Sequence, residues 1–345
     1  MTAPGSQLER EIREQPTVLA ALLQEPNTAI SEVATFLRRR PPRYVVIAAR
    51  GSSDNAARYA QYLFGERLKL PVALAAPSLE SLYAAGAVPR DGEGLVIGIS
   101  QSGRSPDIVS VLTAAREAGA PTLAVTNDTD SPLARAAELV IGIGTGPERA
   151  VAATKTYTAS LAALAALVTQ LRDDGPDGAA LRSVPAFVER AIDDAFVAVE
   201  ALDRHADAKY VLSVARGYNF ATAMEIALKL RELTGAVAEG FSAADLLHGP
   251  IAATPPGTPV IVVAPDGLAR NSVLETARTL HLRGAEPLEI ASTPDAALAL
   301  PSQVPEWLSP IVAVVCGQVL ALRWAVVQGR PLDAPRGLQK VTETY

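Results

Sequence analysis

The feature that most constrains the fold of this 345-residue chain is an internal repeat. Apolar segments of strand length recur further along the chain, each at an offset of about 165 residues. The segments and their counterparts are residues 44–51 and 210–217, 95–100 and 259–264, and 119–125 and 284–290. Unrelated matches would not keep a common offset, so the sequence predicts two copies of one domain.

Apolar runs alternate with helix-prone stretches in the first copy. Strands are expected at 44–49, 71–75, 95–100, 121–126 and 139–143, and helices at 28–40, 56–68, 78–85 and 108–118. The run 44–49 is apolar throughout, which is typical of a parallel strand buried on both faces. The alternation therefore predicts an α/β fold in which each copy is a parallel sheet flanked by helices, an αβα sandwich.

Breaks in composition divide the chain into four parts. A charged, helix-prone stretch at 8–23 contains Pro16, which is expected to interrupt the helix. The polar run 173–178 is rich in helix breakers and predicts the start of the connection between the two copies. The expected parts are an N-terminal helical segment, a first domain, a second domain and a tail, at residues 1–30, 31–175, 176–330 and 331–345.

Composition argues against several classes of protein. The formal net charge of −6 disfavours a nucleic-acid binder, which normally carries a basic face. The single cysteine, Cys316, allows no disulfide within the chain, and the scattered His205, His248 and His281 give no zinc-ligand spacing. No signal peptide is expected from the polar N-terminal residues, and the most apolar long stretch, 157–171, is shorter than a membrane span and predicts a buried helix. We therefore expect a cytoplasmic protein with no membrane or nucleic-acid partner.

The stretch 95–107 is the strongest candidate for a binding site. Its apolar run ends at Ser100, where small hydroxyl-bearing residues begin, and Pro106 and Asp107 suit the first turn of a helix. Free backbone N–H groups, the helix dipole and the serine hydroxyls would then face one point and bind an anion such as phosphate. The alternative is a polar turn with a good helix cap. The second copy has Ala-Pro-Asp-Gly at 264–267, so phosphate is expected in the first copy only.

The helix expected at 221–233 carries charges on an otherwise apolar surface. Glu225, Lys229 and Glu232 fall on a common stripe of this helix. One interpretation is a surface pair between Glu225 and Lys229, which leaves Glu232 without an obvious partner. The other is that Glu232 is a general base, because a carboxylate in an apolar wall suits proton transfer.

His248 is a second candidate for proton transfer. Residues 242–245 resemble a capping box that opens a short helix, and Gly249 and Pro250 would close it after His248. A histidine at a helix C-terminus is a natural proton donor, although its ring could also only cap the last carbonyls. His205 and His281 lack this context and are expected to be surface or structural. In the tail, Arg336 and Lys340 would ordinarily be solvated charges.

A series of short motifs resembles the sugar isomerase (SIS) family in its two-domain form. They lie in family order at residues 11–16, 50–53, 100–103, 151–155, 225–232, 248–250 and 335–340. The chain is similar to the isomerase half of glucosamine-6-phosphate synthase and to stand-alone SIS-type glucosamine-6-phosphate deaminases. The resemblance implies two tandem SIS domains with flavodoxin-like sheets, and it implies chemistry without a metal or a cofactor.

The resemblance also implies a role for individual residues. Glu232 would move a proton between C1 and C2 of the sugar, and Lys340 would approach the carbonyl or its imine. His248 would open the sugar ring and would come from the neighbouring subunit of a homodimer. The residues that would bind the substrate, chiefly its 6-phosphate, are Ser52, Ser53, Ser100, Gln101, Ser102, Ser105, Val151 and Ala153.

Departures from the synthase pattern favour the catabolic reaction. Thr2 offers no N-terminal cysteine for glutamine hydrolysis, and no glutaminase domain is expected before Leu8. Ala153 and Gln339 stand where synthases carry serine and alanine, and residues 340–345 look more like the stand-alone enzymes. The expected reaction converts glucosamine 6-phosphate and water to fructose 6-phosphate and ammonia. The alternatives are a deglycase or isomerase acting on fructosamine 6-phosphate or galactosamine 6-phosphate, and a sugar-phosphate sensor without turnover.

Overall fold

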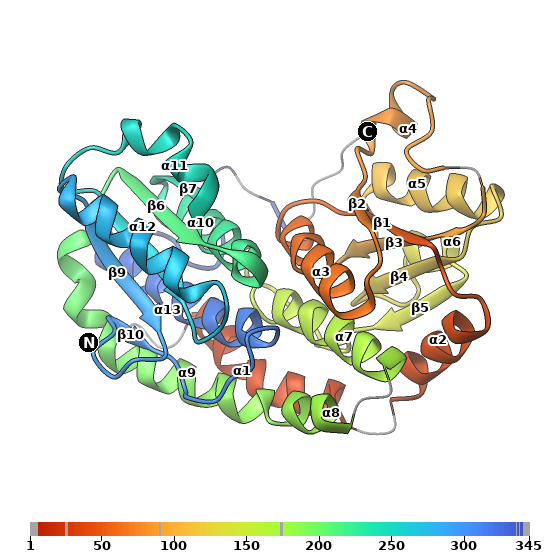
Figure 1. Ribbon diagram of the computed structural model, residues 1–345, viewed down its shortest axis with the longest axis horizontal. Helices are drawn as coiled ribbons and strands as arrows, with labels where there is room; N and C mark the ends of the chain where they lie inside the picture. The colour runs from red at the N-terminus through yellow and green to blue at the C-terminus, as the bar shows by residue number, and fades with distance from the viewer. Residues whose placement is uncertain are drawn as a thin grey trace. The chain divides into compact units, whose positions relative to one another are not determined.

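A computed structural model describes residues 6–24, 27–89, 91–172, 175–335, 337 and 339–340. The chain forms two compact units (Figure 1). The N-terminal unit contains Thr17–Glu148 and Lys155–Arg182. The C-terminal unit contains the described residues up to Pro16, the short segment Arg149–Thr154 and the long stretch Ser183–Lys340. Each unit is described separately below.

The N-terminal unit is built on a five-stranded parallel sheet with the strand order β2-β1-β3-β4-β5. Its strands are β1 (Tyr44–Ala48), β2 (Val72–Leu74), β3 (Gly94–Ser100), β4 (Thr122–Thr126) and β5 (Leu139–Gly142). Every residue of β3 is buried, as expected for a central strand with helices on both faces. In register, Ala48 of β1 lies beside Gly98 of β3, so the two strands end at the same edge of the sheet.

Two groups of helices accompany this sheet (Figure 1). The helices are α2 (Thr28–Arg39), α3 (Ser52–Leu68), α4 (Ser78–Ser81), α5 (Pro106–Glu117), α6 (Pro132–Ala136), α7 (Lys155–Arg172) and α8 (Gly175–Arg182). Helix α7 packs with α2 and α3, whereas α5 packs with α4 and α6. The first fifteen residues of α7 are all buried, which confirms the buried helix expected there. The polar run 173–178 was expected to begin the connection between the two copies, and its described part, from Gly175 onward, belongs to helix α8.

The C-terminal unit repeats this sheet strand for strand. Its strand order, read from the β7 edge, is β7-β6-β8-β9-β10, which matches β2-β1-β3-β4-β5 of the first sheet. All its strand pairs are parallel. The strands are β6 (Tyr210–Ala215), β7 (Val237–Ser242), β8 (Pro259–Ala264), β9 (Glu286–Ala291) and β10 (Leu298–Ala299). The repeated segments of the sequence are the pairs β1/β6, β3/β8 and β4/β9, so the prediction of two α/β copies is confirmed.

An apolar helix forms much of the core of the C-terminal unit. The helical elements are α9 (Val184–Ala198), η1 (Val199–His205), η2 (Gly217–Asn219), α10 (Phe220–Thr234), α11 (Ala243–Leu247), η3 (Pro250–Ala253), α12 (Arg270–Leu282) and α13 (Ser309–Val327). Within the described ranges, only α13 has the length and mean hydropathy (1.9) of a membrane span, and 83% of its apolar window is buried. The most apolar stretch is therefore this core helix, whereas we expected it at 157–171. Gly317 of α13 permits close packing, because a Cβ there would lie 2.3 Å from Cγ1 of Ile226 on α10.

Helix α1 (Gln7–Leu22) continues through Pro16, so the expected interruption is wrong. Proline lacks the N–H group that would donate to the carbonyl of residue 12. The side-chain amide of Gln15 replaces that donor, because its Nε2 lies 3.0 Å from the Ile12 carbonyl oxygen. The same Nε2 donates to Oε1 of Gln318 on α13 at 2.8 Å. The helix therefore continues because a neighbouring side chain satisfies the carbonyl that proline leaves open.

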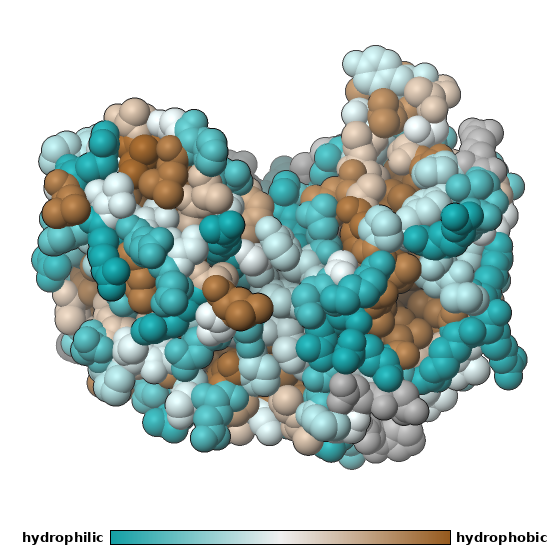
Figure 2. Space-filling model, viewed as in Figure 1, coloured by the Kyte–Doolittle hydropathy of each residue, from teal (hydrophilic) through white to brown (hydrophobic). Residues whose placement is uncertain are grey.

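On the face drawn in Figure 2, hydrophilic and hydrophobic side chains are mixed on both units. The largest exposed apolar side chains around α4 of the N-terminal unit are those of Leu82 and Tyr83, which are 66% and 72% exposed. Most of the other large apolar side chains of this unit lie in its core, between the sheet and its helices.

Candidate functional site

The serine-containing loops of the N-terminal unit meet at one edge of its sheet. After β1 the chain turns to β2 on one side, whereas β3 lies on the other side of β1. In open parallel sheets, ligands bind outside the carboxyl ends of the strands at this reversal of direction. Ser52 and Ser53 begin α3, the helix that follows β1, and Ser100 is the last residue of β3, after which comes the loop 101–105. The fold therefore brings together the two loops that were predicted to bind phosphate.

The loop after β3 has a defined conformation. Oγ of Ser100 accepts a hydrogen bond from the backbone N–H of Gly103 at 3.1 Å, and Oγ of Ser102 lies 3.4 Å from the backbone nitrogen of Arg104. Gly103 has a φ of +62°, and a Cβ there would lie 2.1 Å from Oγ of Ser131, so only glycine fits. Ser105 precedes α5, but its hydroxyl makes no capping hydrogen bond. The good helix cap of the alternative interpretation is therefore not observed at Ser105.

An ion pair joins the loop after β1 to the first turn of α5. The Nε and Nη2 atoms of Arg50 lie 3.0 Å and 2.8 Å from Oδ2 of Asp107. Asp107 is only 1% exposed, whereas half of the Arg50 side chain is exposed. Oδ1 of Asp107 also accepts the backbone N–H of Ile108. Sequence analysis assigned no partner to either residue, although both flank the serine loops. The pair fixes the two loops relative to each other.

In the second copy, a carboxylate of the protein occupies the equivalent position. Glu306 accepts the backbone N–H groups of Leu268 and Ala269, just before α12, at 2.8 Å and 3.1 Å. Gly267, at a φ of +150°, leaves room for this side chain, because a Cβ there would lie 2.3 Å from Cδ of Glu306. These N–H groups correspond to those at the start of α5 in the first copy, which are predicted to bind an anion. Their occupation by Glu306 favours the first copy as the phosphate site.

Charged residues of α10 form a cluster inside the C-terminal unit. Nζ of Lys229 lies 3.4 Å from Oε1 of Glu225 and 2.5 Å from Oε2 of Glu232. The side chains of Glu225 and Lys229 are 0% and 1% exposed, and that of Glu232 is 21% exposed. The interpretation of a surface pair that leaves Glu232 alone is therefore wrong. Spacings of three and four residues place Lys229 against both carboxylates.

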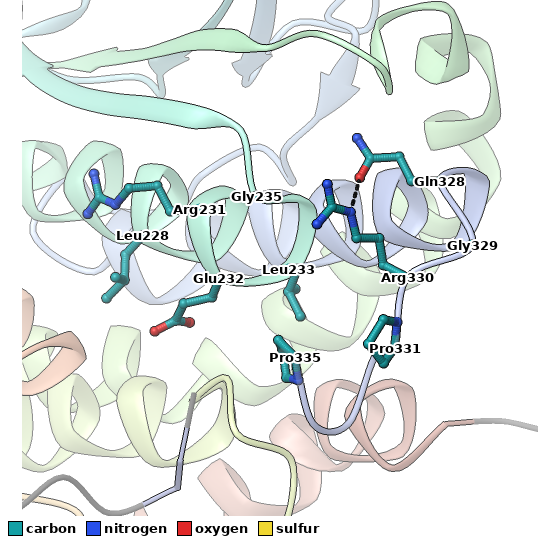
Figure 3. A pocket seen from close by; sticks show the side chains of 10 residues that line it. All are labelled: Leu228, Arg231, Glu232, Leu233, Gly235, Gln328, Gly329, Arg330, Pro331 and Pro335. Carbon is teal, nitrogen blue, oxygen red and sulfur yellow. Dashed lines mark hydrogen bonds between the residues drawn. The ribbon is translucent and has the colours of Figure 1, made fainter. Parts of the chain in front are cut away.

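Glu232 also lies in the wall of a cavity of about 710 Å³, a typical size for a small-molecule pocket (Figure 3). Helix α10 contributes Arg231 and Glu232, and the segment after α13 contributes Arg330 and Pro335. Glu232 points to the side of α10 on which Pro335 lies, whereas Arg231 points to the opposite side. Nε of Arg330 is held by Oε1 of Gln328 at 3.0 Å. A partly exposed, ion-paired carboxylate at a cavity can exchange a proton with a bound molecule.

His248 follows α11, and its Nδ1 lies 2.9 Å from the carbonyl oxygen of Ala244. A carbonyl only accepts hydrogen bonds, so Nδ1 carries the proton and Nε2 remains for other chemistry. The capping interpretation of His248 is therefore observed. The capping box is wrong, because Ser242 makes no side-chain cap at the start of α11. Among the described residues that line the cavity of Glu232, His248 and Lys340 do not occur.

The remaining predicted residues belong to the C-terminal unit. Val151 and Ala153 are half-buried, and the backbone N–H of Val151 donates to the carbonyl of Asp333 at 3.0 Å. Lys340 is half-buried, whereas Arg336 lies outside the described residues. The predicted site residues thus form two groups. The N-terminal unit holds Ser52, Ser53, Ser100, Gln101, Ser102 and Ser105, and the C-terminal unit holds Val151, Ala153, Glu232, His248 and Lys340.

Comparison with known proteins identifies the family. A family model for the SIS domain matches residues 40–170 and 206–304, which contain the two sheets. Glutamine–fructose-6-phosphate aminotransferase (isomerizing) is 33% identical in Halobacterium salinarum and 34% in Thermus thermophilus, over 96% of this chain. The chain spans 58% of the length of these curated relatives.

Solved structures agree with this comparison. A protein from Silicibacter pomeroyi DSS-3, described as a candidate phosphosugar isomerase, is 33% identical with a TM-score of 0.83, over 95% of this chain and 99% of that one. Glucosamine-6-phosphate deaminase from Thermotoga maritima shares the fold at 21% identity and a TM-score of 0.82, over 98% and 100% of the two chains. The repeated sheets, the order of the motifs and these relatives show that the chain belongs to the SIS domain family.

Proposed function

We propose that this protein is an enzyme of the phosphosugar isomerase type that converts glucosamine 6-phosphate and water to fructose 6-phosphate and ammonia. The observation that carries the proposal is Glu232, a carboxylate held by a buried lysine at the wall of a cavity. Aldose–ketose chemistry needs a base of this kind to move a proton between neighbouring carbons. The similarity to proteins named as isomerizing aminotransferases and to a candidate phosphosugar isomerase supports the same class.

The sugar phosphate would bind at the serine loops of the N-terminal unit. The hydroxyls of Ser100, Ser102 and Ser105 and the N–H groups at the start of α5 offer hydrogen bonds to a dianion. Gln101, Ser52 and Ser53 would complete this set, and Val151 and Ala153 would contact the sugar. The phosphate does not react, so its binding energy serves to orient C1 and C2 for proton transfer.

The proposed chemistry begins with the open-chain aldehyde, whose formation we assign to His248 through Nε2. Glu232 removes the proton from C2 while the C1 oxygen gains a proton, which gives an enolamine. Return of the proton to C1 gives a protonated imine at C2. Water adds to this carbon and loses a proton, and the C–N bond then breaks to release ammonia and leave the ketone of fructose 6-phosphate. Lys340 would approach the carbonyl or the imine, and we propose that His248 acts across a homodimer.

An ammonia-release assay tests this function. We expect glucosamine 6-phosphate to yield equal amounts of ammonia and fructose 6-phosphate, and no such products from glucosamine. The same assay with fructosamine 6-phosphate and galactosamine 6-phosphate tests the alternative substrates. If one of these is turned over and glucosamine 6-phosphate is not, the proposed isomerase class is retained but the proposed substrate is wrong. If the protein binds a sugar phosphate tightly but turns over none of the three substrates, the proposed enzyme activity is wrong and the protein is a sugar-phosphate sensor.

A further inference from the structure

The motif at residues 11–16 has no part in the proposed chemistry, yet it contains a fully buried carboxylate. Glu11 on α1 is 0% exposed. Its Oε1 accepts the backbone N–H of Arg149 at 2.5 Å, and its Oε2 accepts that of Ala150 at 3.1 Å. Nε2 of Gln7 also donates to Oε1 at 2.8 Å. Glu11 therefore holds the start of the short segment that carries Val151 and Ala153.

The C-terminal tail is tied to the same helix by a second carboxylate. Oδ2 and Oδ1 of Asp333 accept the backbone N–H groups of Gln7 and Leu8, in the first turn of α1, at 3.1 Å and 2.9 Å. A carboxylate at this position satisfies open helix donors and is stabilised by the helix dipole. Asp333 precedes Lys340 by only a few residues of the tail. The helix therefore holds the base of the tail in a defined position.

A third bond closes the network. The backbone carbonyl of Asp333 accepts the N–H of Val151 at 3.0 Å, so the tail and the 149–154 segment are joined directly. Gln15 attaches the same helix to Gln318 on α13, the helix from which the tail continues. The two segments are far apart in sequence, and each carries residues assigned to the substrate. Charge-assisted bonds from fixed N–H groups orient a carboxylate more narrowly than apolar packing does.

We propose that Glu11 and Asp333 are positioning residues, which set Val151 and the tail that carries Lys340 in one arrangement for the reaction. This inference rests on the proposed function for the roles of Val151 and Lys340. Neither carboxylate acts on the substrate itself. Each acts through the backbone it holds, so its loss misplaces groups that the reaction needs. A small misplacement of such groups lowers the rate more than it lowers binding.

Kinetics of two near-isosteric variants test the effect on the reaction. In Asp333→Asn one helix N–H group faces an amide NH2 group in place of an oxygen, and in Glu11→Gln the same happens at Arg149 or Ala150. We expect kcat to fall about tenfold to a hundredfold in each, with KM changed by less than about threefold. The double variant should lose little more than the worse single one, because both act on one unit. The exposed residues Asp207 and Glu14 provide the controls Asp207→Asn and Glu14→Gln, which should keep kcat.

Hydrogen exchange tests the network without any substrate. The acceptor of the Val151 N–H is the backbone of Asp333, which Asp333→Asn leaves in place. We nevertheless expect the Val151 amide to exchange about tenfold faster in this variant, since the anchor on α1 is weakened. Unchanged exchange at Val151, or a loss of melting temperature with kcat intact, would overturn the inference. A wild-type protein that turns over no sugar phosphate would overturn the proposed function instead, and the exchange result would still decide whether the network exists.

Discussion

Nζ of Lys229 lies 2.5 Å from Oε2 of Glu232, one turn further along α10. Because Lys229 also lies 3.4 Å from Glu225, one buried cation serves two carboxylates. Of the two, only Glu232 reaches the cavity, while Glu225 is fully buried. The helix thus separates a structural carboxylate from one that can meet a ligand.

Glu232→Gln is expected to abolish turnover while substrate affinity is kept. The amide has nearly the same shape but cannot take a proton, so kcat should fall by about 10²-fold or more. The dissociation constant of a sugar phosphate, measured by calorimetry, should stay within about threefold. Glu275→Gln, on the exposed side of α12, is the matched control. Full turnover in Glu232→Gln would remove this residue from the mechanism.

Lys229→Met is expected to destabilise the fold. It leaves the buried Glu225 without its lysine partner, and breaking a buried ion pair in this way costs about 3–5 kcal/mol. Denaturant unfolding measures this loss. Adding Glu225→Gln should recover part of it, because the buried carboxylate no longer carries a charge that faces methionine. A single variant as stable as the wild type would show that the cluster contributes little to stability.

Ser100→Ala with Ser102→Ala is expected to act mainly on KM. The two hydroxyls are assigned to the phosphate, so their loss should raise KM about tenfold or more and change kcat much less. Inorganic phosphate should inhibit the double variant more weakly than the wild type. Thr113→Ala, on the exposed side of α5, is the control. A fall in kcat with KM unchanged would contradict the assignment of these serines to phosphate.

Stability is expected to fall in mild acid because of His205. Burial lowers the pKa of His205 below its usual value, and the charge of Arg204 lowers it further, although Glu286 opposes the shift. As the pH falls through about 6.5, His205 binds a proton in the unfolded chain before it does so in the folded protein. The folded state therefore loses stability below about pH 6.5, and the loss ends only below the lowered pKa of the folded state. Melting temperatures between about pH 8 and pH 5 measure this slope.

Two variants isolate the contribution of His205. His205→Gln cannot titrate, so the dependence of the melting temperature on pH should become weaker. His281→Gln removes an exposed histidine and is the matched control, and the slope of His205→Gln should be the weaker of the two. An equal slope in all three proteins would assign the acid sensitivity to other groups.

The central strands could be predicted because strands buried on both faces are largely apolar, as β1, β3, β4 and β8 show, although β4 has a threonine at each end. Strand β7 escaped prediction because it is an edge strand in which Ala238 alone is buried. The repeat survives in the sequence because equivalent strands need equivalent side chains. The fold class and the family therefore follow from the sequence.

The site could be predicted only where neighbours in the sequence are neighbours in space. The serine loop and the stripe on α10 are local patterns of this kind. The partners of Glu11, Asp333 and Glu306 lie on distant segments, and no spacing indicates them. The spacing of four residues between Glu225 and Lys229 indicates one pair, whereas the spacing of three residues between Lys229 and Glu232 gives the shorter contact in the structure.

Glu306 makes the two copies of the domain differ in whether their helix N–H groups are open to a free anion. The two donors before α12 are hydrogen-bonded to a carboxylate of the chain itself, so a free anion would have to displace Glu306 to bind there. A duplicated fold would ordinarily inherit two places that compete for free anions. Here Glu306 occupies one of them from within, so only the loop after β3 keeps donors for a free anion, which in the proposed function is the phosphate of the sugar.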